Sequence, residues 1–167
     1  MQLPGTTLLV IDDDDHVRQR ISAHMERGGY DVLQARGASE GLAIFNAQRP
    51  GLVLCDLHLG DNSGFALVRE ITERDQDMPV IVISADGVMA DVVEALRLGA
   101  SDYLIKPLDD LVVLEHAVAR SLERSRLSLE NQRIRERLER ANRELENHLK
   151  ELRDDQAAGH QVQLNML

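Results

Sequence analysis

The sequence predicts an α/β fold in which a five-stranded parallel sheet is covered by helices on both faces. Five short apolar runs rich in β-branched residues recur about every twenty residues, at 7–12, 30–35, 52–56, 80–84 and 102–106. Runs that are apolar throughout are typical of strands buried on both faces of a parallel sheet. Segments with helical periodicity lie between the runs, and this alternation is the one that builds such a sheet.

The helical segments are recognised by apolar residues spaced three and four apart. Four segments show this spacing, around Val17–Ile21–Met25, Leu42–Phe45, Leu67–Ile71 and Val92–Leu96. Glycine or proline follows three of them, where a helix is expected to stop: Gly28–Gly29, Pro50–Gly51 and Gly99. At the start of the first helix, Asp14 or Asp15 is expected to be the N-cap, since a short acidic side chain there accepts bonds from free backbone amides.

Polar side chains follow four of the five apolar runs, at positions where an apolar residue would otherwise fit. In open parallel sheets, ligands bind outside the carboxyl ends of the strands, near the switch in strand order. The residues at these ends are Asp12 and Asp13 after the first run, Asp56 at the third, Ser84 at the fourth and Lys106 at the fifth. The sequence therefore predicts that these five residues form one site.

Three carboxylates in one pocket repel each other unless a cation neutralises them. Mg²⁺ prefers oxygen ligands and is commonly held by one or two carboxylates together with a phosphate, and Mn²⁺ accepts the same donors. Asp56 is then a candidate nucleophile, because a carboxylate can accept a phosphoryl group. Lys106 can pair with the phosphate and Ser84 can donate its hydroxyl to it. The residues thus predict Mg²⁺-dependent phosphoryl transfer to Asp56.

The acidic pair followed by "LVLCD", "VISA" and "YLIKP" closely resembles the receiver domain of bacterial two-component response regulators, over residues 7 to about 122. The resemblance implies a flavodoxin-like (CheY-like) fold that takes a phosphoryl group from a histidine kinase or a related phosphotransfer protein. By motif position, it implies that Asp56 is the phosphoacceptor and that Asp12 and Asp13 bind the metal. The backbone carbonyl of His58 would be a further metal ligand.

The same resemblance assigns the switch residues. Ser84 corresponds to the hydroxyl that turns toward the phosphoryl group, and Tyr103 to the aromatic residue that changes rotamer with it. Lys106 corresponds to the phosphate-pairing lysine, and the Lys106–Pro107 peptide is expected to be cis. His58 and Asp86 resemble the family's two variable positions, and the resemblance implies that they would tune the phosphoryl lifetime. The chain departs from the common pattern at Gly60, where many relatives carry proline.

A narrower resemblance concerns the output. The segment "VISADGVMADVVEALRLGASDYLIKPLDDL" resembles RssB-type receivers that control the general-stress sigma factor. The terminal "AAGHQVQLNML" resembles the helix that leads into a PP2C-class serine/threonine phosphatase. These resemblances imply a receiver at 1–122, a helical linker at 123–155, and at 156–167 the start of a missing output domain. A sigma factor or an anti-sigma antagonist would be the partner. The chain itself would then catalyse only its own aspartyl phosphorylation and dephosphorylation.

The region after the fifth run predicts a long helix with a heptad repeat. Neither Gly nor Pro occurs from Leu111 to Leu152. The a and d positions are Leu127, Asn131, Ile134, Leu138, Ala141, Leu145, His148 and Leu152. This pattern predicts a parallel coiled-coil homodimer through residues 127–152, with a stutter near Arg124. A solvated single helix is the alternative, but it would leave this apolar stripe exposed.

Composition limits the functions that fit. The net charge is −10, and residues 1–120 hold 20 acidic against 10 basic side chains. This acidity, with few aromatic residues and no basic stripe, predicts that the chain does not bind nucleic acid directly. The single cysteine, Cys55, excludes an intramolecular disulfide, and the six histidines lack zinc-ligand spacing. Without a signal-peptide pattern or a membrane-length apolar run, a cytoplasmic protein is predicted.

Other phosphate-handling folds agree less well with the sequence. A haloacid-dehalogenase phosphatase needs a second acid two residues after its nucleophile, where this chain has His58. Nucleotide-binding folds need a glycine-rich loop after the first strand, where this chain has acids. The same acids would repel the phosphate of a flavin nucleotide. The alternative that stays open is a pseudo-receiver, a dimerisation scaffold that is never phosphorylated.

Overall fold

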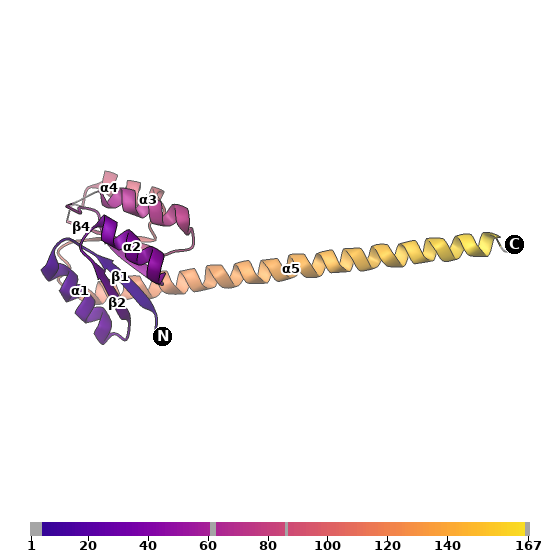
Figure 1. Cartoon of the computed structure of the whole chain (residues 1–167), viewed down its shortest axis with the longest axis horizontal. Helices are drawn as coiled ribbons and strands as arrows, with labels where there is room; N and C mark the ends of the chain where they lie inside the picture. The colour runs from indigo at the N-terminus through magenta and orange to yellow at the C-terminus, as the bar shows by residue number, and fades with distance from the viewer. Residues whose placement is uncertain (1–4, 61–62, 86, 166–167) are drawn as a thin grey trace. The chain divides into compact units, whose positions relative to one another are not determined.

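The computed structural model describes residues 5–60, 63–85 and 87–165, with side chains described up to residue 158 (Figure 1). Five parallel strands form one sheet, which confirms the predicted fold class. The strands are β1 (Thr7–Ile11), β2 (Asp31–Ala35), β3 (Leu52–Asp56), β4 (Val80–Ser84) and β5 (Asp102–Ile105). The chain divides into two units, Met1–Arg126 and Leu127–Leu167.

The strand order, β2-β1-β3-β4-β5, places a switch point between β1 and β3. The chain leaves β1 toward β2 on one side and later returns to β3 on the other. In register, Ile11 lies opposite Cys55, and Asp56 lies opposite Ile83. The carboxyl ends of β1 and β3 are therefore neighbours at the switch point, which is where such sheets bind ligands.

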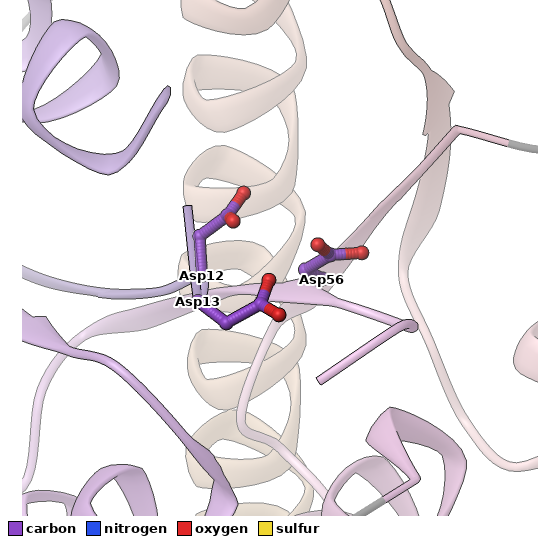
Figure 2. A group of neighbouring side chains, drawn as sticks. All are labelled: Asp12, Asp13 and Asp56. Atoms are coloured by element: carbon purple, nitrogen blue, oxygen red, sulfur yellow. The ribbon is translucent and has the colours of Figure 1, made fainter. Parts of the chain in front are cut away.

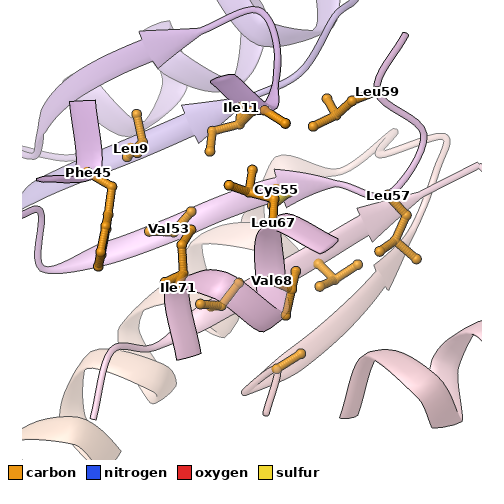
Figure 3. Packing of buried hydrophobic residues seen from close by; sticks show 14 of the residues in the cluster. Leu9, Ile11, Phe45, Val53, Cys55, Leu57, Leu59, Leu67, Val68 and Ile71 are labelled. Atoms are coloured by element: carbon orange, nitrogen blue, oxygen red, sulfur yellow. The ribbon is translucent and has the colours of Figure 1, made fainter. Parts of the chain in front are cut away.

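Helices cover both faces of the sheet. α1 (Asp15–Arg27) and the first turns of α5 (Leu111–Asn165) pack on one face, in a cluster that includes Ile21, Leu114 and Val118. On the other face lie α2 (Ala38–Gln48), α3 (Gly64–Arg74) and α4 (Met89–Arg97), whose core Figure 3 shows. Neighbouring residues of a strand face opposite ways, so Leu8 and Val10 enter the first cluster whereas Leu9 and Ile11 enter the second.

The helix ends agree with most of the turn signals. Asp14 is the N-cap of α1 and accepts hydrogen bonds from the amides of His16 and Val17, at 2.9 and 3.2 Å, as predicted. At the end of α2, the sequence predicted a helix stop at Pro50–Gly51 but did not indicate the backbone conformation of the residue before it. Arg49, the C-cap of α2, has a left-handed backbone with φ of 47°. The following Pro50 disfavours continued helix at this position.

The long helix predicted from residue 111 onward is confirmed as α5, which continues to Asn165. Its first turns bury Leu111, Leu114 and Val118 against the sheet. In the second unit, every side chain from residue 127 to residue 158 is exposed in the single chain. The apolar residues of the heptad pattern are among them, with Leu138 at 65% and Leu145 at 57% exposed.

Gly64 is needed where the loop after β3 folds back on the strand and starts α3. Its amide donates to the carbonyl of Leu57 at 3.0 Å. A Cβ at this position would lie 2.4 Å from the carbonyl oxygen of Asp56 and 2.6 Å from the Cα of Leu57. Both are backbone atoms of the segment that presents Asp56, so they cannot give way without moving the site.

We expect Gly64→Ala to lower the free energy of unfolding by about 1–3 kcal/mol, the usual cost of overpacking. The matched control is Gly60→Ala in the same loop, where the nearest atom to a Cβ is Asp13 Oδ2 at 3.5 Å, an ordinary contact. Urea unfolding of both variants checks the prediction. Equal stabilities would contradict it.

Candidate functional site

Three carboxylates meet at the switch point of the sheet. Asp12 and Asp13 follow β1, and Asp56 is the last residue of β3. One carboxylate oxygen from each residue lies within 4.8 Å of the other two (Figure 2). Asp12 and Asp56 are 2% and 5% exposed, whereas Asp13 is exposed. The cluster is thus buried on the side of the sheet and open to solvent at Asp13.

Lys106 joins the two buried carboxylates. Its Nζ donates to Asp12 Oδ2 at 2.8 Å and to Asp56 Oδ2 at 3.0 Å. The lysine follows β5, and its amide donates to the carbonyl of Ser84 at 2.7 Å, which fixes the backbone beside β4. The Lys106–Pro107 peptide is cis, as the resemblance implied. An ammonium between two carboxylates offsets part of their mutual repulsion.

The remaining oxygen of each buried carboxylate is held by the local backbone. Asp12 Oδ1 accepts from the amide of Asp14 at 2.9 Å, and Asp56 Oδ1 accepts from the amide of His58 at 3.0 Å. In both cases the donor is the amide two residues further along the chain, so the turn that follows each aspartate fixes the orientation of its carboxylate. The side chains are therefore positioned by the strand ends and the turns that follow them.

Burial and ion pairing act in opposite directions on the pKa values of Asp12 and Lys106. Burial raises the pKa of Asp12, and the hydrogen bonds from Lys106 and Asp14 oppose this only in part. Burial by itself lowers the pKa of Lys106, but Asp12 and Asp56 together outweigh it and raise that pKa, so the lysine stays charged. Because the folded-state pKa of Asp12 exceeds the unfolded value, its contribution to stability is present below the unfolded pKa and is lost as the pH rises through the folded pKa.

The residues present fit a divalent cation. Mg²⁺ takes oxygen ligands and usually keeps several waters. Asp12, Asp13 and Asp56 supply three closely spaced oxygens, and the exposure of Asp13 leaves one side of the cluster to water. A bound cation would also offset the cost of ionising the buried Asp12 at neutral pH. The prediction that the carbonyl of His58 joins these ligands stays a prediction.

Ser84 and Tyr103 lie at different depths relative to the cluster. Ser84 ends β4 and is completely buried, at the same sheet edge as Asp56. Tyr103 lies within β5, opposite Val82, and its half-buried side chain packs against the core beneath α3 and α4. The structure therefore brings Asp12, Asp13, Asp56 and Lys106 together, with Ser84 at the same edge. Asp86 lies outside the described residues.

Lys106 also lines a cavity of about 370 Å³ that the sequence did not indicate. The other lining residues are Val17, Arg20, Ile21, Ala85, Pro107, Leu108 and Leu111. A second feature that sequence reasoning missed is Arg18, which is only 4% exposed. The one available signal for it was its place between Val17 and Ile21, on the face of α1 that was expected to be buried.

A parallel 2-1-3-4-5 sheet with three carboxylates and a lysine at the ends of its strands defines a receiver-like α/β domain. The family model described as the response regulator receiver domain matches residues 8–119, more than half of the chain. The chain belongs to this family of two-component signalling domains.

Curated relatives and solved structures agree with this family. The chain is 37% identical over 103 residues to the photosynthetic apparatus regulatory protein RegA of Cereibacter sphaeroides, covering 62% of this chain and 56% of RegA. It is 37% identical over 121 residues to the acid tolerance regulatory protein ActR of Sinorhizobium medicae, covering 72% of this chain and 62% of ActR. The chain thus spans little more than half the length of these relatives.

Among solved structures, NtrX from Brucella abortus superposes with a TM-score of 0.74 at 32% identity, over 78% of this chain and 30% of NtrX. A receiver domain protein from Methanospirillum hungatei superposes with a TM-score of 0.69 at 27% identity, over 74% of this chain and 98% of that one. In the part of the chain that the structure describes, no helix is long and apolar enough to cross a membrane.

We expect Mg²⁺ to stabilise the wild-type chain against thermal unfolding and Asp13→Asn to remove most of this stabilisation. Binding to the folded state alone is worth about 2.7 kcal/mol when the free ion is at a hundred times its Kd. Asp31→Asn is the matched control. Asp31 is an exposed acid at the start of β2, whereas the site lies at the carboxyl ends of the strands. Melting curves in Mg²⁺ and in EDTA check the prediction, and equal shifts in the two variants would contradict it.

Proposed function

We propose that this chain is a phosphorylation-controlled receiver that accepts a phosphoryl group on Asp56 in a Mg²⁺-dependent reaction. Membership of the receiver family supports a histidine kinase or a phosphotransfer protein as the phosphodonor. The observation that carries the proposal is the position of Asp56, buried at a strand end, bonded to Lys106 and within 4.8 Å of Asp12 and Asp13. A nucleophile, a fixed cation and a candidate metal site are thus within one pocket.

In the proposed reaction, a carboxylate oxygen of Asp56 attacks the phosphorus of the donor. The new O–P bond makes an acyl phosphate, and the electron pair of the breaking bond leaves with the donor group. Lys106 transfers its hydrogen bonding from the carboxylates to the phosphoryl oxygens, and Ser84 donates its hydroxyl to one of them. Mg²⁺, when bound, would neutralise charge on the carboxylates and the phosphoryl oxygens.

The proposed output begins at Ser84 and Tyr103. Movement of Ser84 toward the phosphoryl group would draw in the loop after β4, and Tyr103 would follow, which alters the surface formed by α4, β5 and α5. This surface carries exposed apolar side chains, among them Met89 and Val93 on α4 and Ile105 at the end of β5. Exposed apolar groups that are grouped together commonly mark a protein contact.

Intact-protein mass spectrometry tests the proposal. Wild-type chain incubated with Mg²⁺ and acetyl phosphate, or with a phosphorylated phosphotransfer protein, should gain one phosphoryl adduct. Asp56→Asn should gain none, because an amide is not a nucleophile of this kind, and EDTA should prevent the wild-type reaction. Asp31→Asn serves again as the control and should react as the wild type does.

An adduct on Asp56→Asn would show that another residue is the acceptor. No adduct on the wild type with either donor would favour the alternative, a pseudo-receiver that acts as a dimerisation scaffold. That alternative keeps the fold and α5 but makes no use of the Asp56–Lys106 pair.

We further propose that residues 127–152 pair with a second copy as a parallel coiled coil. The a and d side chains are exposed in the single chain, so they would remain in water without a partner. Ala141 contributes to a hollow between Leu138 and Leu145, where a side chain of a facing helix can insert. Asn131 at an a position favours a dimer with one register, and Glu130 can pair with Arg135 of the second copy.

Cysteines at Leu138 and Leu145 test the parallel dimer. Leu138→Cys and Leu145→Cys should each give disulfide-linked dimers on mild oxidation, since equivalent a positions face each other in a parallel pair. Arg143→Cys, on the outer face of the same helix, is the control and should give few. Equal yields at all three positions would contradict the dimer, and yields unchanged by phosphorylation would show that the signal does not reach this segment.

The RssB-type output belongs to the same proposal. It is supported by the likeness of residues 82–111 to such receivers, and it would make a sigma factor or an anti-sigma antagonist the partner. The proposal of a PP2C phosphatase as output rests separately on the likeness of the terminal "AAGHQVQLNML" to the helix before such domains. A further relative is the phosphate regulon transcriptional regulatory protein PhoB of Pseudomonas aeruginosa, 34% identical over 121 residues. The prediction that this chain itself binds no nucleic acid therefore stays a prediction, which a gel-shift measurement can check.

A further inference from the structure

Arg18 is a charged side chain buried in the first unit, and neither the core nor the proposed reaction explains it. It lies in the first turns of α1 and is only 4% exposed. A guanidinium stays charged in proteins, and removing it from water is costly unless its N–H groups find partners. The partners of Arg18 therefore indicate its role.

Three elements supply these partners. Arg18 Nη1 donates to the main-chain carbonyl of Asp12 at 2.9 Å, and Nε donates to Gln34 Oε1 on β2 at 3.2 Å. Nη2 forms an ion pair with the carboxylate of Asp15, to which Arg36 also bonds from the exposed side. The guanidinium thus connects the end of β1 to β2 and to the start of α1.

The contact with Asp12 completes a set in which every polar atom of that residue is held. The amide of Asp12 donates to the carbonyl of Ala35 at 3.1 Å, and its two carboxylate oxygens accept from Asp14 and Lys106. The carbonyl that Arg18 holds belongs to the peptide group that joins Asp12 to Asp13. The orientation of this peptide determines the direction in which the exposed Asp13 side chain leaves the backbone.

We propose that Arg18 is a positioning residue for the cation site. It fixes the Asp12–Asp13 peptide so that the Asp13 carboxylate stays within reach of Asp56. The inference rests on the Mg²⁺ site of the proposed function, but in it Arg18 touches neither the cation nor the phosphoryl group. Lysine cannot replace it fully, because a single ammonium lacks the planar fork that reaches three partners at once.

Calorimetric titration of the full chain with Mg²⁺ tests this role. Arg18→Met keeps the apolar stem and removes the donors, and it should raise the Kd for Mg²⁺ about tenfold or more, as loss of a residue that orients a metal ligand commonly does. Arg36→Met, which removes the other partner of Asp15, should change Kd less than about twofold. The rate of phosphorylation by acetyl phosphate at saturating Mg²⁺ should stay near the wild-type rate, because Asp56 and Lys106 are unchanged.

A lower unfolding midpoint in EDTA combined with an unchanged Kd would make Arg18 a structural residue only and would overturn the inference. If Arg18→Met does not fold, Arg18→Lys and Gln34→Leu each remove part of the network, and wild-type Kd values in both would overturn it as well. Failure of the wild type to bind Mg²⁺ would overturn the proposed function together with this inference. Binding by the wild type and by Arg18→Met with equal Kd would overturn this inference alone.

Discussion

The ammonium of Lys106 between the carboxylates of Asp12 and Asp56 is the interaction on which the rest of the site depends. Two buried carboxylates and a third beside them repel each other, and burial raises the pKa of Asp12. Lys106 supplies the counter-charge within hydrogen-bonding distance of both. Its position depends in turn on the pairing of β5 with β4 and on the hydrogen bond from the Lys106 amide to the carbonyl of Ser84. The sheet therefore sets the electrostatics of the pocket.

The same arrangement connects the pocket to the surface that would carry a signal. Ser84 and Lys106 are joined by a main-chain hydrogen bond, so groups that would bind a phosphoryl oxygen belong to adjacent strand ends. Tyr103 lies on the second of these strands, against the core under α3 and α4. A phosphoryl group on Asp56 would therefore meet groups that β4 and β5 present, Ser84 and Lys106.

Much of this site could be predicted because it depends on strand ends, and strand ends can be read from apolar runs that stop at a polar residue. Asp12, Asp56, Ser84 and Lys106 all belong to this kind. Arg18 could not be assigned in the same way, because two of its three partners, the carbonyl of Asp12 and the side chain of Gln34 on β2, are known only from the fold. The left-handed backbone of Arg49 was missed because arginine is not a residue type that indicates this conformation. Contacts between parts of the chain that are distant in sequence can be assigned only once the fold is known.

The burial of Cys55 determines how this domain responds to oxidants in the cell. The only thiol of the chain is fully buried in β3, directly before Asp56, and burial together with the neighbouring carboxylates raises its pKa. Oxidants and electrophiles react with exposed thiolates. A peroxide burst would thus leave the Cys55 thiol, and with it the strand that presents Asp56, chemically intact.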